Sequence, residues 1–499
     1  MKLPALAAAA LAVLLAGCDP AVGLRSIPDD PAAATAFYVD RIAMIDDAGP
    51  RLNSVIVYDR DAAAKSRALT GTGPLGGRAV LVKDNIETRE WPTTAGSLAL
   101  ADNMTGRDAP LVARLRQAGG VVLGKTNLSE WANIRSNRST SGWSAVGGLT
   151  RNPHATDRNA CGSSSGSGAA VAAGLAWAAI GTETDGSITC PASVNGVVGF
   201  KPTVGLVSRT HVVPISATQD TAGPMTTSVA DAALLLDAIA GSDPADPATA
   251  QADRYAGRFA AGLAGASLKG VRIGVLRKQA GQRADVLALF DRALADMKAA
   301  GAELVEIDYA EPDAMYEAEG TVLYYELREG LAAYLAGSPA AIPVRNLDEV
   351  IAFNAAHAAE EMRWFGQESF LRAQKTTDRA AYQKALADGV RLAGREGIDR
   401  LLTDNNLAVL VAPTGGPAWP SDLVYGDNFP GGIGAGSLAA IAGYPHLTVP
   451  MGTVERLPVG LSFMGTKWDD LTVLRAGAAY EAARSAEIPK PSLRPWSPD

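Results

Sequence analysis

Three short segments carry side chains that could act together in acyl transfer. Lys83 follows an apolar run, residues 161–168 are rich in serine and glycine, and residues 181–188 read Gly-Thr-Glu-Thr-Asp-Gly-Ser-Ile. A serine hydroxyl is a weak nucleophile until a neighbouring base takes its proton. Each segment alone is weak evidence, because Ser/Gly segments usually form turns and a lysine at a strand end is usually solvated. The segments predict a catalytic site only if they meet in the fold.

Lys83 could supply the base only if its amine is neutral. Free lysine has a pKa of about 10.4 and is charged at neutral pH. Burial beside the apolar residues 80–82 would favour the neutral amine. Lowering the pKa by about three units corresponds to roughly 4 kcal/mol of differential interaction. The carboxylate of Asp84 would oppose this if it faced the amine, so we predict that Asp84 points elsewhere.

A serine–histidine arrangement is the alternative. Residues 162–166 fit the Gly-x-Ser-x-Gly nucleophile elbow, with Ser164 as the nucleophile. An elbow follows a strand directly, whereas residues 152–160 are polar and turn-like. Of the histidines that follow, His446 is the one arguable partner. A serine esterase of the α/β-hydrolase type, using Ser164 and His446, therefore remains the second interpretation.

Composition argues against several other classes. The net charge is −8, and no long basic run is present, so we expect no nucleic-acid partner. The chain has 4 His and 3 Cys, without the closely spaced pairs that bind metals. No Gly-Lys-Ser/Thr sequence follows a glycine cluster, which excludes a phosphate-binding loop. We expect neither a metal nor an organic cofactor, and the sequence leaves the oligomeric state open.

The N-terminus predicts export. An apolar run at residues 3–16 is too short to cross a bilayer as a stable helix. It ends in a Leu-Ala-Gly-Cys sequence at Cys18, which resembles a bacterial lipobox, where the signal is cut before a lipidated cysteine. We expect residues 1–17 to be a lipoprotein signal peptide and residues 18–34 a tether. Acyl chains would then hold the protein on the periplasmic side of the envelope. An ordinary signal peptide, giving a freely secreted protein, is the alternative.

Two further cysteines, Cys161 and Cys190, have two interpretations. An oxidising compartment permits a disulfide between them. The simpler interpretation, which we prefer from sequence, is a pair of small buried thiols. The separation of their Cα atoms decides the matter.

The remaining pattern predicts an α/β protein in which helices cover a sheet. The expected strands are residues 78–82, 121–124, 178–180, 196–200, 271–276, 409–413, 447–450 and 459–464. The expected helices are residues 33–48, 59–69, 110–118, 166–179 and 284–300, with residues 314–396 largely helical. Residues 166–179 are small and apolar, so we expect a buried central helix whose N-terminus faces the Ser/Gly segment.

Together, the three segments resemble the amidase signature family. The interval of 24 residues from Ser163 to Ser187, the loop followed by a small-residue helix, and the Gly-Thr-Glu-Thr-Asp-Gly-Ser sequence match the family's core pattern. Further matching motifs, in the family's order, are residues 124–130, 199–203, 220–224 and 411–414. The resemblance covers about residues 35–485.

The resemblance implies a catalytic role for each segment. Ser187 would attack the amide carbonyl, and Ser163 would relay its proton, with the Gly162–Ser163 peptide bond in the cis form. Lys83 would be the ultimate base. Acylation of Ser187 would release ammonia or an amine, and water would then cleave the acyl-enzyme.

The resemblance also places an oxyanion site at the loop before the nucleophile. The backbone N–H groups of Thr184, Asp185, Gly186 and Ser187 would surround the oxyanion. The commonest family pattern has two glycines before the nucleophile, whereas Asp185 replaces the first of them here. The usual arginine two residues after the nucleophile is Thr189. This variant is similar to the bacterial peptide amidase branch, which removes the C-terminal amide from peptides. Asp185 could contact the substrate or its own loop.

The resemblance implies one large domain over residues 35–490, with a mixed central sheet covered by helices on both faces. Residues 70–240 would form the catalytic core, residues 243–400 a helical substrate-side region and residues 405–485 the C-terminal strands. The substrate cavity would draw on residues 314–370 and 415–445. The candidates for its aromatic wall are Tyr324, Tyr325, Trp364, Phe365 and Trp419.

The expected activity is hydrolysis of linear carboxamide C–N bonds, with C-terminal peptide amides or related carboxamides as substrates. A glutamine-tRNA amidotransferase component is disfavoured, because export would separate the chain from tRNA. A catalytically inactive binding protein on the same scaffold is a further alternative, although Lys83, Ser163 and Ser187 are all present.

Overall fold

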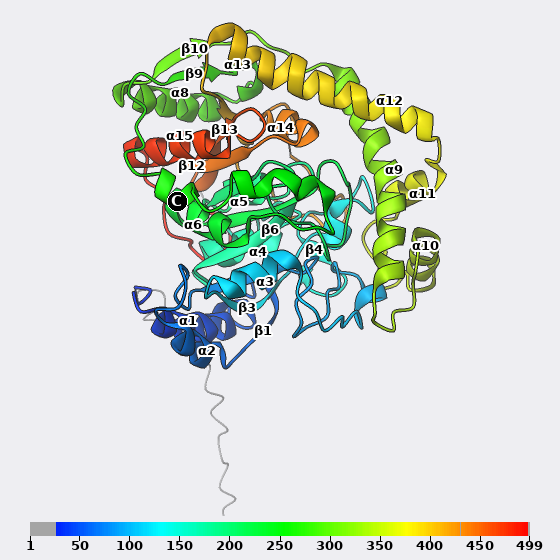
Figure 1. Cartoon of the computed structure of the whole chain (residues 1–499). Helices are drawn as coiled ribbons and strands as arrows, with labels where there is room; N and C mark the ends of the chain where they lie inside the picture. The colour runs from blue at the N-terminus through cyan, green and yellow to red at the C-terminus, as the bar shows by residue number, and fades with distance from the viewer. Residues whose placement is uncertain (1–25, 430, 498–499) are drawn as a thin grey trace, which may run out of the picture.

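A mixed sheet of eleven strands runs through the molecule (Figure 1). The computed structural model describes residues 26–429 and 431–497. The strands of the large sheet are β1 (Val55–Tyr58), β2 (Ala79–Lys83), β3 (Val121–Thr126), β6 (Ala178–Glu183), β7 (Val198–Lys201), β8 (Thr221–Thr226), β9 (Arg272–Val275), β10 (Glu303–Glu306), β11 (Val409–Pro413), β12 (His446–Val454) and β13 (Leu457–Met464). A separate two-stranded sheet pairs β4 (Trp143–Ser144) with β5 (Gly148–Leu149).

The strand order is β1-β3-β2-β6-β8-β7-β12-β13-β11-β9-β10. Strands β3, β2 and β6 are parallel, as are β11, β9 and β10, while the strands between β6 and β11 run antiparallel to their neighbours. The predicted mixed sheet is therefore confirmed. Every strand expected from the sequence is present; β11 has the expected ends, and the ends of the others differ by a few residues.

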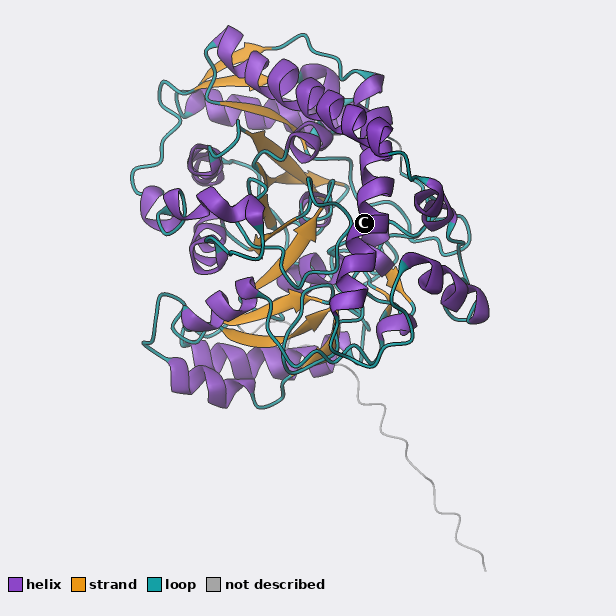
Figure 2. Cartoon of the chain, turned by 45° about the vertical axis from the view of Figure 1, so that its right-hand side comes forward, coloured by secondary structure: helices purple, strands orange, loops and turns teal. Residues whose placement is uncertain are grey.

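Helices cover both faces of the sheet (Figure 2). The α-helices are α1 (Pro31–Arg41), α2 (Ala62–Leu69), α3 (Pro110–Gln117), α4 (Ser165–Ala172), α5 (Thr189–Val194), α6 (Val229–Ile239), α7 (Phe259–Gly262), α8 (Ala284–Ala299), α9 (Asp313–Gly337), α10 (Leu347–Ala356), α11 (Glu368–Lys375), α12 (Arg379–Val390), α13 (Arg400–Asn405), α14 (Gly436–Ala442) and α15 (Asp470–Ala483). One hydrophobic cluster joins the sheet to α3, α6, α8 and α15, and a second joins it to α1, α4 and α5.

Alternation along β2 fixes which face Lys83 occupies. Val80 and Val82 pack in the first cluster, whereas Ala79 and Leu81 pack in the second, on the side of α4. Successive side chains of a strand point to opposite faces. Lys83 therefore projects on the same face as Leu81, toward α4.

Helices α9 to α12 form a flank on the right of Figure 1. Leu327 and Leu331 of α9 pack against Val350 of α10 and Phe370 of α11 in a cluster of their own. This confirms the largely helical character expected for residues 314–396. Among the described residues, no helix is both long and apolar enough to span a bilayer.

The helix expected over residues 166–179 is shorter than the sequence pattern indicates. Helix α4 is buried along almost its whole length, as expected, but it ends at Ala172. Gly174 then adopts a φ of 66°, a left-handed conformation that favours glycine and ends the helix. From Ala178 the chain pairs with β2 and β8 instead. Small apolar residues suit both a buried helix and a buried strand, so composition alone does not separate them.

The expected signal peptide, with Cys18, lies outside the described residues. Helix α1 begins at Pro31, inside the range expected for the tether, and Asp30 caps it by accepting a hydrogen bond of 2.8 Å from the backbone N–H of Ala33.

Candidate active site

The carboxyl ends of two parallel strands bring the predicted residues together. Strands β2 and β6 are neighbours, with Val82 opposite Ile180. Lys83 is the last residue of β2, and Glu183 is the last residue of β6, directly before the loop formed by residues 184–187. Because parallel strands end at the same edge of a sheet, both segments reach one place.

Lys83 is completely buried and hydrogen-bonded to Ser163. Its Nζ lies 2.8 Å from Ser163 Oγ, 2.8 Å from Thr182 Oγ1 and 3.2 Å from the Thr182 carbonyl oxygen. Burial lowers the pKa of Lys83 to about 7, against the opposing effect of the carboxylates of Asp220 and Glu183. A large fraction of the amine is therefore neutral near pH 7 and able to accept a proton from Ser163.

Asp84 points away from that amine, as predicted. Its Oδ1 pairs with Lys125 Nζ at 2.9 Å, and its Oδ2 accepts hydrogen bonds from the backbone N–H and hydroxyl of Thr94. Lys125 also donates to the carbonyl oxygen of Ile86 at 2.8 Å. A second buried lysine therefore balances the charge of Asp84 on the opposite side from Lys83.

The segments carrying Ser163 and Ser187 are in direct contact. The backbone N–H of Ser164 donates to the carbonyl oxygen of Ser187 at 3.0 Å, and the N–H of Ser129 donates to that of Ser163 at 3.0 Å. The Gly162–Ser163 peptide bond is cis, as the family resemblance implies. A Cβ on Gly162 would lie 2.1 Å from Ser129 Oγ, so a larger residue there would have to displace the Ser129 side chain. Within the described residues, no group hydrogen-bonds the hydroxyl of Ser187.

The loop of residues 184–187 offers unused donors. None of its four backbone N–H groups donates a hydrogen bond to any other described residue. Gly186 has a φ of 77°, which favours glycine. Glu183 Oε2 accepts from the backbone N–H groups of Ile188 at 2.7 Å and Thr189 at 2.9 Å, holding the far side of the loop. Consecutive free N–H groups in a turn suit an oxyanion.

Three polar residues of the site have roles that sequence reasoning missed. Thr182 bonds Lys83, Glu183 holds the turn, and Asp220 Oδ1 accepts a hydrogen bond of 2.6 Å from Thr184 Oγ1. All three lie inside motifs that the sequence singled out; Thr182 and Glu183 are buried, and Asp220 is half-buried. For Glu183, the sequence did contain a signal, which is a glutamate at the end of an apolar strand. A carboxylate that is buried there requires hydrogen-bond donors from the residues around it.

Asp185 contacts neighbouring helices rather than its own loop. Its Oδ2 accepts a hydrogen bond of 2.7 Å from Ser437 Oγ of α14. Its charge also acts on Glu319 of α9, whose Oε1 accepts a hydrogen bond of 2.9 Å from Gln219 Nε2. Burial, together with the charge of Asp185, raises the pKa of Glu319 to about 8, so Glu319 is largely protonated at neutral pH.

The preference for two free thiols at Cys161 and Cys190 is wrong. The two residues form a disulfide, with Cα atoms 6.0 Å apart. Cys161 stands two residues before Ser163, and Cys190 three residues after Ser187. The disulfide therefore joins the two segments that carry the serines. It can form because the fold brings these segments into contact.

Replacing both cysteines by alanine is expected to lower the unfolding free energy by about 3–4 kcal/mol. The bond closes a loop with a sequence separation of 29, and closing such a loop removes entropy from the unfolded chain. Chemical denaturation of the Cys161→Ala/Cys190→Ala variant, compared with wild-type protein under non-reducing conditions, measures the change. As a control, reduced wild-type protein should match the double variant. An unchanged denaturation midpoint would contradict the prediction.

The esterase arrangement is not found. Ser164 Oγ donates to the carbonyl oxygen of Thr182 at 3.0 Å, and His446 Nε2 lies 2.6 Å from Ser462 Oγ. Residues 152–160 form turns rather than the strand that an elbow requires. His446 therefore orients Ser462, while Ser164 is held by the backbone of β6.

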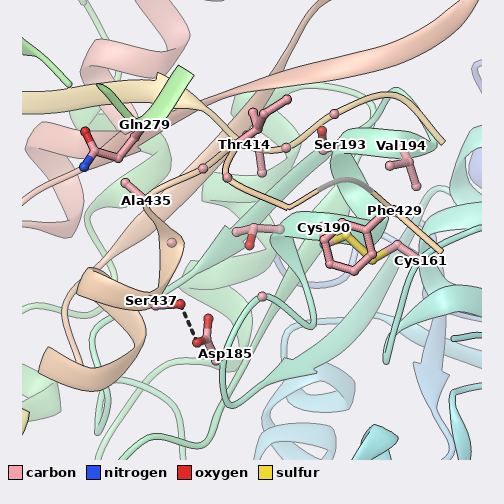
Figure 3. A pocket seen from close by; sticks show the side chains of 18 of the residues that line it. Cys161, Asp185, Cys190, Ser193, Val194, Gln279, Thr414, Phe429, Ala435 and Ser437 are labelled. Carbon is pink, nitrogen blue, oxygen red and sulfur yellow. Dashed lines mark hydrogen bonds between the residues drawn. A yellow bond between two sulfur atoms is a disulfide. The ribbon is translucent and has the colours of Figure 1, made fainter. Parts of the chain in front are cut away.

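A cavity of about 590 Å³ opens beside the serines. Gly162, Asp185 and Gly186, which are neighbours of Ser163 and Ser187, line it. Figure 3 shows the disulfide and Phe429 on one side, and Gln279, Ser437 and Asp185 on the other. The side chains that line the apolar side include Cys161, Cys190, Val194, Trp419 and Phe429.

Most of the aromatic candidates lie elsewhere. Of the five, Trp419 lines this cavity. Tyr325 stacks on Tyr382 with ring centroids 4.2 Å apart, and Phe365 packs edge-on against Trp143 at 5.2 Å. A wall aromatic that sequence reasoning missed is Phe429, at the mouth of the cavity. Within residues 26–429 and 431–497, no cluster of three or more His, Cys, Asp or Glu side chains is placed to hold a metal ion.

Known proteins are similar to this chain in sequence and in fold. The amidase family model matches residues 33–474. A probable amidase of Arabidopsis thaliana is 38% identical over 467 residues, covering 90% of this chain and 85% of that protein. The native peptide amidase of Stenotrophomonas maltophilia superposes with a TM-score of 0.88 at 49% identity, covering 93% and 95%. A peptide amidase in complex with the competitive inhibitor chymostatin superposes with a TM-score of 0.88 at 50% identity, covering 93% of this chain and 96% of that chain. The chain therefore belongs to the amidase family and is an amide hydrolase.

Proposed function

We propose that this enzyme cleaves carboxamides through a Ser187–Ser163–Lys83 relay. The single observation that carries the proposal is the 2.8 Å hydrogen bond between buried Lys83 Nζ and Ser163 Oγ. Ser187 stands in backbone contact with the segment of Ser163, and its hydroxyl is not committed to another described residue. A neutral amine in this position can take a proton that a charged one cannot.

In the acylation step, Ser187 Oγ forms a bond to the carbonyl carbon, and its proton passes to Ser163 as the proton of Ser163 passes to Lys83. The carbonyl oxygen becomes an oxyanion facing the backbone N–H groups of residues 184–187. The tetrahedral intermediate then collapses. The C–N bond breaks, and the leaving nitrogen takes a proton back through Ser163.

In the deacylation step, water attacks the acyl carbon of the Ser187 ester. The relay accepts a proton from water and returns one to Ser187 Oγ. The products are the carboxylic acid and ammonia, or an amine when the nitrogen is substituted, and in neutral water they ionise to carboxylate and ammonium. In both steps the proton passes from the attacking oxygen to Ser163 and from Ser163 to Lys83, and it returns by the same route, so the enzyme regains its starting state with water as the one co-reactant.

We propose C-terminal peptide amides, or closely related carboxamides, as the substrates. The peptide amidase structures are 49–50% identical to this chain, which supports this class. The cavity of about 590 Å³ is within the range that holds a ligand of several residues, and its apolar side suits a hydrophobic side chain.

A matched substrate panel tests the proposal. Ammonia release is measured from an N-acetyl dipeptide amide, propionamide and benzamide, and release of the free acid is measured from the methyl ester of the same dipeptide as comparison. We expect the dipeptide amide to have the highest kcat/KM among the three amides. A fluorophosphonate probe followed by peptide mass mapping should label Ser187. Turnover of the ester without any amide, or a label on Ser164, would refute the proposal.

We further propose that the enzyme is lipid-anchored at Cys18 outside the cytoplasm. The Leu-Ala-Gly-Cys sequence supports the anchor. The disulfide between Cys161 and Cys190 supports an oxidising compartment, because disulfides are rare in the bacterial cytoplasm. Metabolic labelling with palmitate should tag the wild-type protein and not a Cys18→Ala variant. Equal amounts of label in both proteins would reject the anchor.

A further inference from the structure

Thr182 is the residue that holds the amine of Lys83 beside Ser163. Its carbonyl oxygen lies 3.2 Å from Lys83 Nζ, and its Oγ1 lies 2.8 Å from the same atom. The third contact of Lys83 Nζ is with Ser163 Oγ, also at 2.8 Å. A neutral amine has two N–H donors and one lone pair. The lone pair is free for the proton of Ser163 only when both donors go to Thr182.

The hydroxyl of Thr182 can bond the amine in two opposite senses. A hydroxyl has one O–H donor and two acceptor lone pairs, and it rotates to suit its surroundings. In one orientation, Thr182 Oγ1 accepts a hydrogen bond from an N–H of Lys83. In the other, it donates its hydrogen to the lone pair of Lys83, which can then no longer take the proton of Ser163. Activation of Ser163 therefore depends on how this hydroxyl is oriented.

Asn85 makes a hydrogen bond that selects the first orientation. Its Nδ2 donates to Thr182 Oγ1 at 2.9 Å. Among the described residues, the donors to this oxygen are Asn85 and Lys83, and together they occupy both of its lone pairs. All three side chains are buried, so water does not replace either bond. The hydrogen of the Thr182 hydroxyl then points away from Lys83.

The backbone fixes the position of Asn85. Strand β2 ends at Lys83, and the chain turns at once, with the N–H of Ile86 donating to the carbonyl oxygen of Lys83 at 3.0 Å. The carbonyl oxygen of Asn85 accepts a hydrogen bond of 2.8 Å from the N–H of Val213. Neither Asn85 nor Thr182 is among the described residues that line the cavity of about 590 Å³. Asn85 therefore acts on the reaction through Thr182 and not by contact with the substrate.

We propose that Asn85 is a positioning residue of the relay: it orients the hydroxyl of Thr182 so that this group accepts a hydrogen bond from Lys83 and leaves the lone pair of the amine to Ser163. This inference rests on the proposed relay and adds to it the group that keeps the base available. Both protonation states of Lys83 fit the arrangement. After the proton transfer, the three N–H donors of the ammonium face three oxygens, which are Ser163 Oγ and the two of Thr182.

Carboxylates already act on Lys83 from two other elements. Burial lowers the pKa of Lys83 to about 7, although Asp220, directly before β8, and Glu183, at the end of β6, favour the charged amine. Asp84, in the same turn as Asn85, is paired on the opposite side. The amide of Asn85 thus supplies a donor without another negative charge. A carboxylate at this position would still orient the hydroxyl, by accepting its hydrogen, but it would raise the pKa of Lys83.

The rate at which a fluorophosphonate labels Ser187 measures activation by the relay without amide turnover. Asn85→Leu removes the donor and keeps a side chain of similar size, so labelling should be about 10-fold slower at every pH. Asn85→Asp should approach the wild-type rate at high pH, but the inflection of its pH profile should move alkaline by about 1 unit or more.

Asn354 provides matched controls on α10. It is buried like Asn85, and its Nδ2 likewise donates to a side-chain oxygen, Gln367 Oε1, at 3.0 Å. Asn354→Leu and Asn354→Asp should therefore keep the wild-type labelling rate and inflection. A shift in Asn354→Asp equal to that in Asn85→Asp would count against the proposal, because the effect would not depend on contact with Thr182.

A double-mutant cycle tests whether Asn85 acts through Thr182. A Thr182→Val enzyme has no hydroxyl to compete for the lone pair, so adding Asn85→Leu should slow labelling less than about 3-fold. In a Thr182→Ser enzyme, which keeps the hydroxyl, the same change should slow labelling about 10-fold. Equal effects in the two backgrounds would overturn the proposal and leave Asn85 a structural role. Thermal unfolding identifies any variant that does not fold, and if one Asn85 variant fails, the other decides.

Lys83→Met separates this inference from the proposed function. We expect slow labelling of both Lys83→Met and Asn85→Leu. Labelling of Lys83→Met at the wild-type rate would refute the relay, and the role of Asn85 with it. Slow labelling of Lys83→Met, combined with a wild-type rate for Asn85→Leu and an unshifted inflection for Asn85→Asp, would refute the role of Asn85 alone.

Discussion

Replacing Ser187 by alanine is expected to reduce kcat for the best amide substrate at least about 10⁴-fold. The variant lacks the atom that forms the acyl-enzyme, and enzymes of this kind without their nucleophile retain only what binding and the oxyanion site contribute. Folding should be little affected, because the hydroxyl of Ser187 bonds no other described residue. Steady-state ammonia release and a burst-phase assay for the acyl-enzyme measure the effect.

Ser164→Ala is the matched control. Ser164 lies in the other serine segment, where its backbone N–H donates to the carbonyl oxygen of Ser187 and its hydroxyl bonds the backbone of Thr182. Its loss should lower the unfolding free energy by about 1 kcal/mol while keeping kcat within about 10-fold of wild type. If Ser164→Ala abolished activity and Ser187→Ala retained it, the assignment of Ser187 as the nucleophile would be wrong. The result would then support Ser164 as the nucleophile of an elbow-type esterase.

Replacing Lys83 by methionine is expected to reduce kcat/KM by about 10³- to 10⁴-fold. Methionine keeps an unbranched apolar chain in the buried site but has no lone pair of nitrogen to accept the proton of Ser163. The effect should appear in kcat rather than KM, because Lys83 touches Ser163 and Thr182 and does not line the cavity. A Lys83→Met enzyme with near-wild-type kcat would exclude the relay.

The pH profile of the wild-type enzyme follows from the same group. The relay needs neutral Lys83, whose pKa is lowered to about 7. Below that pH, kcat/KM should fall about tenfold per unit, and above it the rate should level off. The residual activity of Lys83→Met should lack this inflection. A wild-type profile without a group titrating near pH 7 would argue against Lys83 as the base.

Stability gives an independent check with a defined sign. Between pH 7 and pH 10.5 the unfolded chain holds a proton on Lys83 that the folded chain does not, so wild-type stability rises with pH in this window. Relative to Lys83→Met, the gain is about 1.4 kcal/mol per pH unit. Denaturant titrations of both proteins across this range measure the difference. A constant difference would mean that the lysine stays charged when folded.

Local patterns predicted much of the fold. A short apolar run before Lys83, rich in valine and preceded by a glycine-rich break, predicts a buried strand, because such runs are typical of sheets covered on both faces. The amphipathic stripe of residues 284–300 likewise predicts helix α8. Residues 166–179 misled the prediction, since uniformly small residues carry no periodicity and the turn at Gly174 decides where the helix ends.

Contacts between distant segments were harder to foresee. The sequence predicted that Asp84 would avoid Lys83, but Lys125, its partner, lies on a different strand. Aromatic residues of α9 were candidates for the cavity wall, yet Tyr325 faces α12 instead. The sequence of such a helix does not show which neighbouring element each face contacts. The elements that pack against the helix decide this in the folded protein.

By itself, the sequence determined which reactive groups this protein contains: a lysine at a strand end and two serine-bearing loops at a fixed interval. The motifs of the amidase family around them predict amide hydrolysis. The tertiary structure decided what those groups can do. Burial lowers the pKa of Lys83, the disulfide joins Cys161 to Cys190, and Asp185 turns toward α14 and α9. These outcomes depend on atoms brought together from far along the chain. Solvation and distance set the pKa values and the pairings, and both exist only after packing.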